Sequence, residues 1–176
     1  MKMNIARRSL YTALVRIFNN ETSNLVVLEN MISYDAQASL DYAYALRKPF
    51  AAGEGAIATS AELSYYYAKD ILRGRFLAGE DAIATSAEFS YLYAKDILRG
   101  RFLAGEAVIA TSGGFSLLYA QYVLHGRFKL GELKIAESET YSFFYAKNVL
   151  NGPFPLGESV IYEGRAYVAE YAKLCA

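Results

Sequence analysis

The chain has 176 residues, of which 54% are hydrophobic and 20% charged, which is enough for a domain with a substantial core and excludes a disordered tail. Eighteen basic and eighteen acidic side chains cancel to a formal net charge of zero, so the general field that attracts nucleic acid or anionic lipid is missing. A single cysteine, Cys175, and a single histidine, His125, exclude an internal disulfide and a histidine-based metal cage.

The N-terminal segment 1–26 is expected to form a capping helix. Apolar residues recur near helical spacing at Ile5, Leu10, Leu14 and Val15, a pattern typical of an amphipathic helix. Arginines interrupt every apolar run in this segment, so neither a signal peptide nor a membrane span is expected. Attachment to a membrane surface is the alternative. We favour the capping helix, with no membrane partner and a cytoplasmic location.

A 26-residue repeat dominates the remaining sequence. The dipeptide Gly-Glu recurs at 53, 79, 105, 131 and 157. Copies 53–78 and 79–104 are identical at 23 of 26 positions. The next two copies, 105–130 and 131–156, are more divergent, and 157–176 is a truncated copy. Residues 27–52 lack Gly-Glu but align without a gap through Leu46, Arg47 and Phe50, so they are interpreted as a degenerate first repeat within a single repeat domain, 1–176.

Each copy is predicted to contain a short helix followed by a longer one. The longer helix begins at the capping box Thr85-Ser86-Ala87-Glu88, in which a Thr hydroxyl and a Glu carboxylate satisfy each other's backbone amides. It ends at Gly100, where a missing Cβ permits a left-handed cap. The same structural role is expected of Gly74, Gly126 and Gly152. Residues 105–110 suit a short helix of two turns.

Large aromatic side chains are expected to fill the space between repeats. A phenylalanine recurs just beyond each helix end, at Phe50, Phe76, Phe102, Phe128 and Phe154, and it is predicted to be a structural wedge. A tyrosine recurs in the apolar stripe at Tyr67, Tyr93, Tyr119, Tyr145 and Tyr171, and each needs a partner for its hydroxyl. One such unit cannot bury this surface alone. We therefore predict an all-α solenoid of short helix-turn-helix repeats with an N-terminal capping helix.

Candidate catalytic residues are absent from the sequence pattern. His125 takes the place of Arg73 and Arg99 at a helix end, where a donor or cation suits the helix dipole. Cys175 occupies a stripe position and is expected to be a small core residue. The glycines are spaced too widely for a phosphate-binding loop, and the carboxylates are too dispersed for a metal site. We predict a protein that is not an enzyme and has no cofactor or metal ion.

Two sets of residues are candidates for binding. Arg75, Arg101 and Arg127 form a column, each five residues before a glutamate. The favoured interpretation is a ladder of Arg–Glu pairs between adjacent repeats; the alternative is that the arginines bind an anion, carboxylate or phosphate. Tyr65 and Tyr91 lie beside the stripe and are candidates for contacting a protein or stacking on bases.

The block YAKDILRGRFLAGEDAIATSAEFSYLYAKDILRGRFLAGE resembles a family of short tandem-repeat proteins found in tailed-bacteriophage genomes, built on variants of YAK-D-V/I-L-x-G-R-F/W-P-x-x-E. The resemblance covers residues 53–158. Most copies have Leu or Lys where the family often has Pro, and only Pro155 matches that habit. The resemblance implies a phage origin and a helical repeat, and it carries over no catalytic residue.

These features together predict a non-enzymatic binding protein that presents an extended face to a protein partner, either a host factor or a copy of itself. One alternative is a binder of nucleotides or nucleic acid that uses the arginine column and tyrosines. The other is a structural or filament-forming component, since uncapped repeat ends can stack. The zero net charge favours the protein partner, and a phage protein of this kind would lie in the cytoplasm of the host cell.

Overall fold

The computed structural model describes residues 5–19, 21 and 24–176, and these form helices and turns without any β-strand. Residues 1–4, 20 and 22–23 of the expected capping segment lie outside the described part. The chain divides into two compact units, Met1–Ile83 and Ala84–Ala176, so the boundary falls inside the copy 79–104. Within the described residues, no helix combines the length and the apolar character that crossing a bilayer requires.

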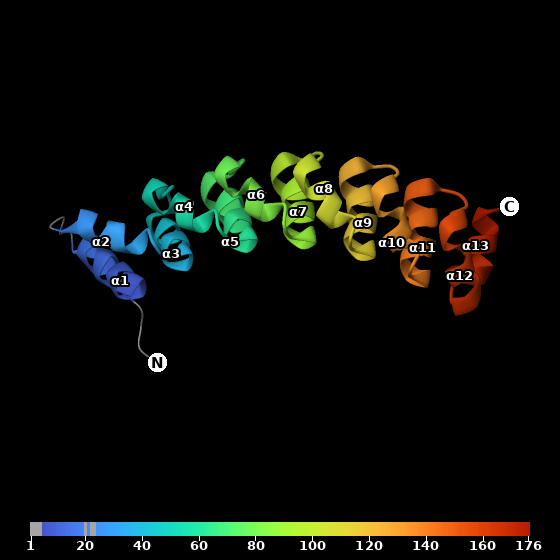
Figure 1. Cartoon of the computed structure of the whole chain (residues 1–176), viewed down its shortest axis with the longest axis horizontal. Coiled ribbons are helices and arrows are strands. Elements are labelled where there is room, and N and C mark those ends of the chain that lie inside the picture. The colour runs from blue at the N-terminus through green and yellow to red at the C-terminus, as the bar shows by residue number, and fades with distance from the viewer. Residues whose placement is uncertain (1–4, 20, 22–23) are drawn as a thin grey trace. The chain divides into compact units, whose positions relative to one another are not determined.

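Unit 1 consists of helices that pack in pairs (Figure 1). Its helices are α1 (Ile5–Phe18), α2 (Leu25–Ile32), α3 (Ala36–Leu46), α4 (Glu54–Ile57), α5 (Ala61–Tyr66) and α6 (Glu80–Ile83). Short 3₁₀ turns, Ala51–Gly53 and Leu77–Gly79, lead into α4 and α6. Helix α1 packs against α2 and α3, α4 packs against α3, and α6 packs against α5. The buried residues of α1 are small, namely Ala6, Ser9 and Ala13, whereas Ile5 is exposed.

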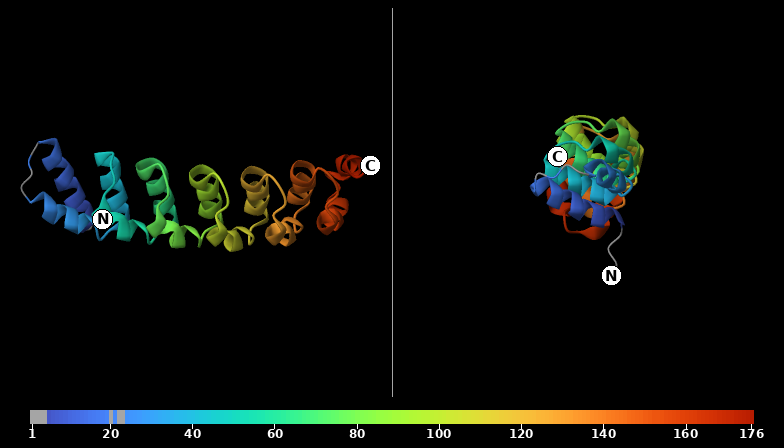
Figure 2. Two further views of the ribbon diagram at one scale, coloured as in Figure 1. Left: turned by 90° about the horizontal axis from the view of Figure 1, so that it is seen from above. Right: turned by 90° about the vertical axis from the view of Figure 1, so that its left-hand side faces the viewer.

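Unit 2 continues the same alternation of short and long helices (Figure 2). Its helices are α7 (Ala87–Tyr93), α8 (Leu103–Ile109), α9 (Gly113–Tyr119), α10 (Glu132–Ile135), α11 (Glu139–Tyr145), α12 (Glu158–Gly164) and α13 (Val168–Leu174). The long helices α7, α9 and α11 lie side by side, each in contact with the next. Each short helix packs mainly against the long helix that precedes it, as α8 does on α7. The tightest helix pair is therefore offset by half a repeat from the sequence copy.

A glycine allows this close packing of short helix on long helix. A Cβ placed on Gly105 would lie 2.5 Å from the Oγ of Ser90 and 2.6 Å from the ring of Phe102. The equivalent glycines face the same serine and phenylalanine in the other copies, at Gly53, Gly79, Gly131 and Gly157. The serine is satisfied within the repeat, since the Ser116 hydroxyl donates to the carbonyl of Ile109 at 3.0 Å. The glycine of the Gly-Glu signature is therefore required by space.

The long helices begin at a serine, one residue later than predicted. The side chain of Ser86 accepts a hydrogen bond from the backbone N–H of Phe89, three residues on. Ser60, Ser112 and Ser138 cap in the same way. The predicted capping box of Thr85 and Glu88 is therefore wrong, because Ser86 already satisfies the amide at the third helical position. In the next copy, Thr111 instead donates back to the carbonyl of Val108 at 2.7 Å.

The long helices end in a π-helical turn that was not predicted. Residues Ala94–Leu98 form such a turn, and the backbone N–H groups of Arg99 and Gly100 both donate to the carbonyl of Ala94. The left-handed residue is Arg99, with φ of 50°, and no glycine has positive φ in the described chain. The predicted left-handed caps at Gly74, Gly100, Gly126 and Gly152 are therefore wrong. A Cβ on Gly100 would meet only a carbonyl oxygen at 3.8 Å, so nothing in the structure explains this glycine.

The π turn accounts for a one-residue difference between the first two repeats of unit 1. Before the turn, equivalent contacts are 25 residues apart: Tyr42 donates to Glu29, and Tyr67 donates to Glu54. After the turn, Phe50 and Phe76 are 26 residues apart. Helix α3 ends with an ordinary α turn, in which the N–H of Arg47 reaches the carbonyl of Ala43. The gapless alignment of 27–52 is therefore wrong, because later copies have one extra residue in the long helix.

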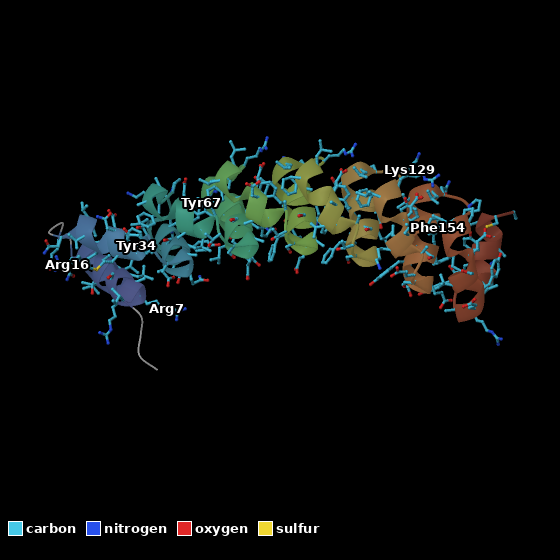
Figure 3. The ribbon with its side chains drawn as sticks, viewed as in Figure 1. Arg7, Arg16, Tyr34, Tyr67, Lys129 and Phe154 are labelled. Carbon is cyan, nitrogen blue, oxygen red and sulfur yellow. The ribbon has the colours of Figure 1, made fainter. Side chains whose placement is uncertain are left out.

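The aromatic residues of the repeat lie in the core. The five wedge phenylalanines are between 1% and 6% exposed, and the stripe tyrosines are fully buried. Within each unit, the ring of a stripe tyrosine meets the following phenylalanine edge-on, as Tyr93 and Phe102 do with centroids 5.3 Å apart. Figure 3 labels Tyr67 in unit 1 and Phe154 in unit 2 as examples of these two positions. Such edge-to-face pairs stabilise the fold beyond the burial of their area.

Candidate binding face

The arginine column is paired with glutamates through two hydrogen bonds per pair. The Nε and Nη2 groups of Arg101 donate to the two carboxylate oxygens of Glu106, each at 2.8 Å. Arg127 makes the same contacts with Glu132 at 2.8 and 2.9 Å. The third such pair joins Arg75 to Glu80. Each pair bridges a turn to the first residues of the following short helix, so it stabilises a local segment five residues long.

A buried tyrosine extends each of these pairs into a network. The hydroxyl of Tyr119 donates to Glu106 at 2.9 Å and accepts from the backbone N–H of Phe102 at 3.0 Å. This hydroxyl thus connects α9 to both the turn and α8. The same two contacts recur at Tyr67, Tyr145 and Tyr171. The stripe tyrosines therefore have the hydroxyl partners that they need in the core.

The electrostatics of the network favour a charged glutamate and a neutral tyrosine. The hydrogen bonds from Arg101 lower the pKa of Glu106, and this outweighs the opposing effect of burial. At Glu132, burial raises the pKa, but the hydrogen bonds from Arg127 and Tyr145 together lower it. Burial is the main reason why the pKa of Tyr119 rises to about 12, with a further increase from its hydrogen bond to Glu106. The carboxylate is therefore held in the charged form that accepts three hydrogen bonds.

We expect Glu106→Gln to reduce the acid sensitivity of the fold. The pKa of Glu106 is lower in the folded chain than its ordinary value of 4.5, so the unfolded state takes up protons first as the pH falls. The stabilisation by the charged group is complete above pH 4.5 and is lost as the pH falls through the folded-state pKa. The variant should have a lower Tm at pH 7 and a smaller difference in Tm between pH 7 and pH 3.

Glu137→Gln is the matched control for this measurement. The Glu137 carboxylate is 63% exposed and pairs with Lys134 three residues away, so its removal should change neither Tm nor its pH dependence. Equal effects of the two substitutions would contradict a special contribution from the Arg101–Glu106–Tyr119 network.

The tyrosines that were candidates for an exposed aromatic surface are buried. Tyr65 and Tyr91 are 2% and 5% exposed. Lys95 lies over the ring of Tyr91, with its Nζ 5.7 Å from the centroid, and Lys69 lies over Tyr65 in the same way. In unit 2, the Phe115 ring lies 6.1 Å from Tyr91. The expectation that these two rings contact a protein or stack on bases is therefore wrong, since neither presents an open face.

Exposed leucines lie beside the paired arginines instead, and the sequence analysis missed them. Leu103 is 69% exposed and follows the wedge residue Phe102, while Leu130 and Leu156 are 58% and 51% exposed one position further along their copies. Leu133 is 71% exposed in α10, and Leu77 in unit 1 is 70% exposed. We call Leu103, Leu130, Leu133 and Leu156 the leucine row of unit 2. Their recurrence after each wedge phenylalanine was a visible signal, but turn positions were not considered for binding.

An open cleft of about 470 Å³ lies next to this row in unit 2. Its lining residues are Arg101, Glu106, Leu124, Gly126, Arg127, Phe128, Lys129 and Leu130. The guanidinium groups of two successive copies thus line one hollow, together with apolar side chains. The arginine side chains are 59% and 54% exposed although both are paired.

The remaining candidates lie away from this cleft. His125 is exposed and is the left-handed residue after the π turn of α9, with φ of 50°. Cys175 is exposed just beyond α13, so the expectation of a core position for Cys175 is wrong. Within the described residues, no group of three His, Cys, Asp or Glu side chains is arranged to hold a metal ion.

Comparison of the chain with family models, curated proteins and solved structures finds no match.

Proposed function

We propose that this chain is a non-enzymatic helical-repeat binding protein, encoded by a phage and acting in the host cytoplasm, whose exposed leucines contact a protein partner. The leucine row supports this proposal most directly. A single exposed leucine is ordinary on a protein surface, but here leucines more than half exposed recur beside each wedge phenylalanine of unit 2. Apolar side chains interspersed with arginines are the composition that protein interfaces favour.

The arginine column alone gives less support to nucleic-acid binding. Each arginine of the column is compensated by a glutamate at hydrogen-bond distance, so the column adds little net positive charge to attract phosphates. The two tyrosines proposed for base stacking are buried, and stacking needs an accessible ring face. A protein partner requires neither feature. It can be a host factor or a second copy of this chain.

Site-specific photo-cross-linking tests the proposed face. A benzophenone amino acid is placed at Leu103 or Leu156 in the chain expressed in bacteria, and cross-linked products are identified by mass spectrometry. The control position is Tyr122, which is 49% exposed in the same unit but lies in the π turn of a long helix. A discrete protein product from the two leucine positions and none from Tyr122 is expected. Products from Tyr122 alone, or only nucleic acid from all positions, would overturn the proposal.

A further inference from the structure

The cleft between Arg101 and Arg127 has hydrogen-bond donors that the internal pairs do not use. A guanidinium group carries five N–H donors, and the printed contacts of Arg101 with Glu106 use one on Nε and one on Nη2. The same two atoms of Arg127 contact Glu132. The Nη1 edge of each group therefore remains outside its pair, on a side chain that is more than half exposed. Two such edges at one cleft can bind an oxygen acceptor without breaking either pair.

Lys129 adds a positive charge that no neighbour neutralises. It is exposed, and no ion pair of Lys129 occurs within the described residues, whereas the two cleft arginines are each paired. The equivalent position holds Leu77, Leu103 or Pro155 in the other copies, so this cleft has a charge that its counterparts lack. Figure 3 labels Lys129 in unit 2. With both arginines compensated, one positive charge remains to attract a ligand.

This balance of charge favours a carboxylate over a phosphate. A carboxylate carries one negative charge and matches the single uncompensated lysine. A phosphate dianion would face Glu106, which lines the cleft, and Glu132, which is bonded to Arg127, and like charges at short range are unfavourable. The apolar lining residues Leu124, Phe128 and Leu130 also suit the carbon atoms of an organic ligand and give a free inorganic ion nothing to contact.

We infer that this cleft binds an acidic side chain of the partner protein, with an apolar residue of the same segment packed on Leu130 or Leu133. The inference rests on the proposed function and specifies the partner's chemistry: an extended segment in which Asp or Glu stands next to apolar residues. The Nη1 edges of Arg101 and Arg127 and the ammonium group of Lys129 donate to the carboxylate. The leucine row covers the neighbouring apolar side chains.

The test uses two peptides that differ only in the acidic group. The probes are acetyl-Leu-Asp-Leu-amide and acetyl-Leu-Asn-Leu-amide, titrated into the full-length ¹⁵N-labelled chain. Binding is followed by NMR through the side-chain Nε–H signals of Arg101 and Arg127 and the amide of Leu130. We expect the Asp peptide to bind at least about tenfold more tightly than the Asn peptide, because charge-assisted hydrogen bonds are much stronger than neutral ones.

Matched lysine variants place the effect at the cleft. Lys129→Gln should weaken binding of the Asp peptide at least about fivefold. Lys134→Gln removes the same charge from a lysine paired with Glu137 in the same unit and should leave the affinity unchanged. Equal binding of the two peptides, equal effects of the two variants, or displacement of the Asp peptide by inorganic phosphate at matched ionic strength would overturn the inference. If cross-links from Leu103 persist in that case, the proposed function stands and only the acidic ligand is wrong.

Discussion

Replacing Phe102 with alanine is expected to lower the free energy of unfolding by about 3–5 kcal/mol, the range for a large aromatic removed from a packed core. The ring is 3% exposed and meets Tyr93 edge-on. It also packs against the backbone of Gly105, where α8 approaches α7. The surrounding helices are held by backbone hydrogen bonds and cannot collapse fully into the space, so a cavity adds to the lost burial. Urea denaturation followed by circular dichroism measures the change.

Leu103→Ala is the control for this substitution. It removes a side chain of similar character from the next position in the chain, but that side chain is 69% exposed. Its removal should change the free energy of unfolding by less than about 0.5 kcal/mol. A loss for Phe102→Ala of under about 1 kcal/mol would show that the phenylalanine does not hold successive helices together.

The start of each long helix shows how far the sequence could lead. Thr85 and Ser86 are both good capping residues, and the glutamate three residues after Thr85 favoured the threonine. Comparison of the copies would have settled the choice, because Thr59-Ser60, Thr85-Ser86 and Thr111-Ser112 become Glu137-Ser138 in the fourth. Only the serine is common to all four. The existence of the helix was predictable from its apolar stripe, whereas its first residue depended on a competition between two neighbouring hydroxyls.

The π turn could not be predicted from residue types. An N–H bonded five residues back uses the same side chains as one bonded four residues back, and such turns are rare. The visible trace was the spacing in unit 1, where Tyr42 and Tyr67 differ by 25 residues but Phe50 and Phe76 differ by 26. That change of spacing within one copy requires an extra residue in the long helix. Its hydrogen-bond pattern became apparent only in the structure.

The candidate site was predictable in its ion pairs and not in its accessible surface. A five-residue spacing was enough to suggest that Arg101 and Glu106 pair, because it places a turn residue next to the first turn of the following helix. Exposure depends on the neighbouring helices, which a single copy does not reveal. Tyr91 was therefore misplaced on the surface, although Phe115 and Lys95 lie against its ring.

Gly105→Ala should lower the free energy of unfolding by about 3 kcal/mol, a large penalty for adding one methyl group. The new Cβ would lie 2.5 Å from Ser90 Oγ and 2.6 Å from both Ser90 Cβ and the Phe102 ring. These distances are far inside van der Waals contact, and the neighbours are themselves buried. Helix α8 must therefore move away from α7 or displace the wedge ring, and either movement loses packing. Chemical denaturation of the purified chain measures the penalty.

Two further variants distinguish this clash from a general effect of replacing a helical glycine. Gly55→Ala in α4 adds a Cβ that has no atom within 4 Å, so helix propensity should leave the stability unchanged or raise it by up to about 1 kcal/mol. Ser90→Gly removes two of the three clashing atoms, so the double variant with Gly105→Ala should be destabilised by less than the sum of the single changes. Additive losses, or equal losses for Gly55→Ala and Gly105→Ala, would contradict close packing at the Gly-Glu signature. The repeat would then owe its invariant glycine spacing to something other than the approach of its helices.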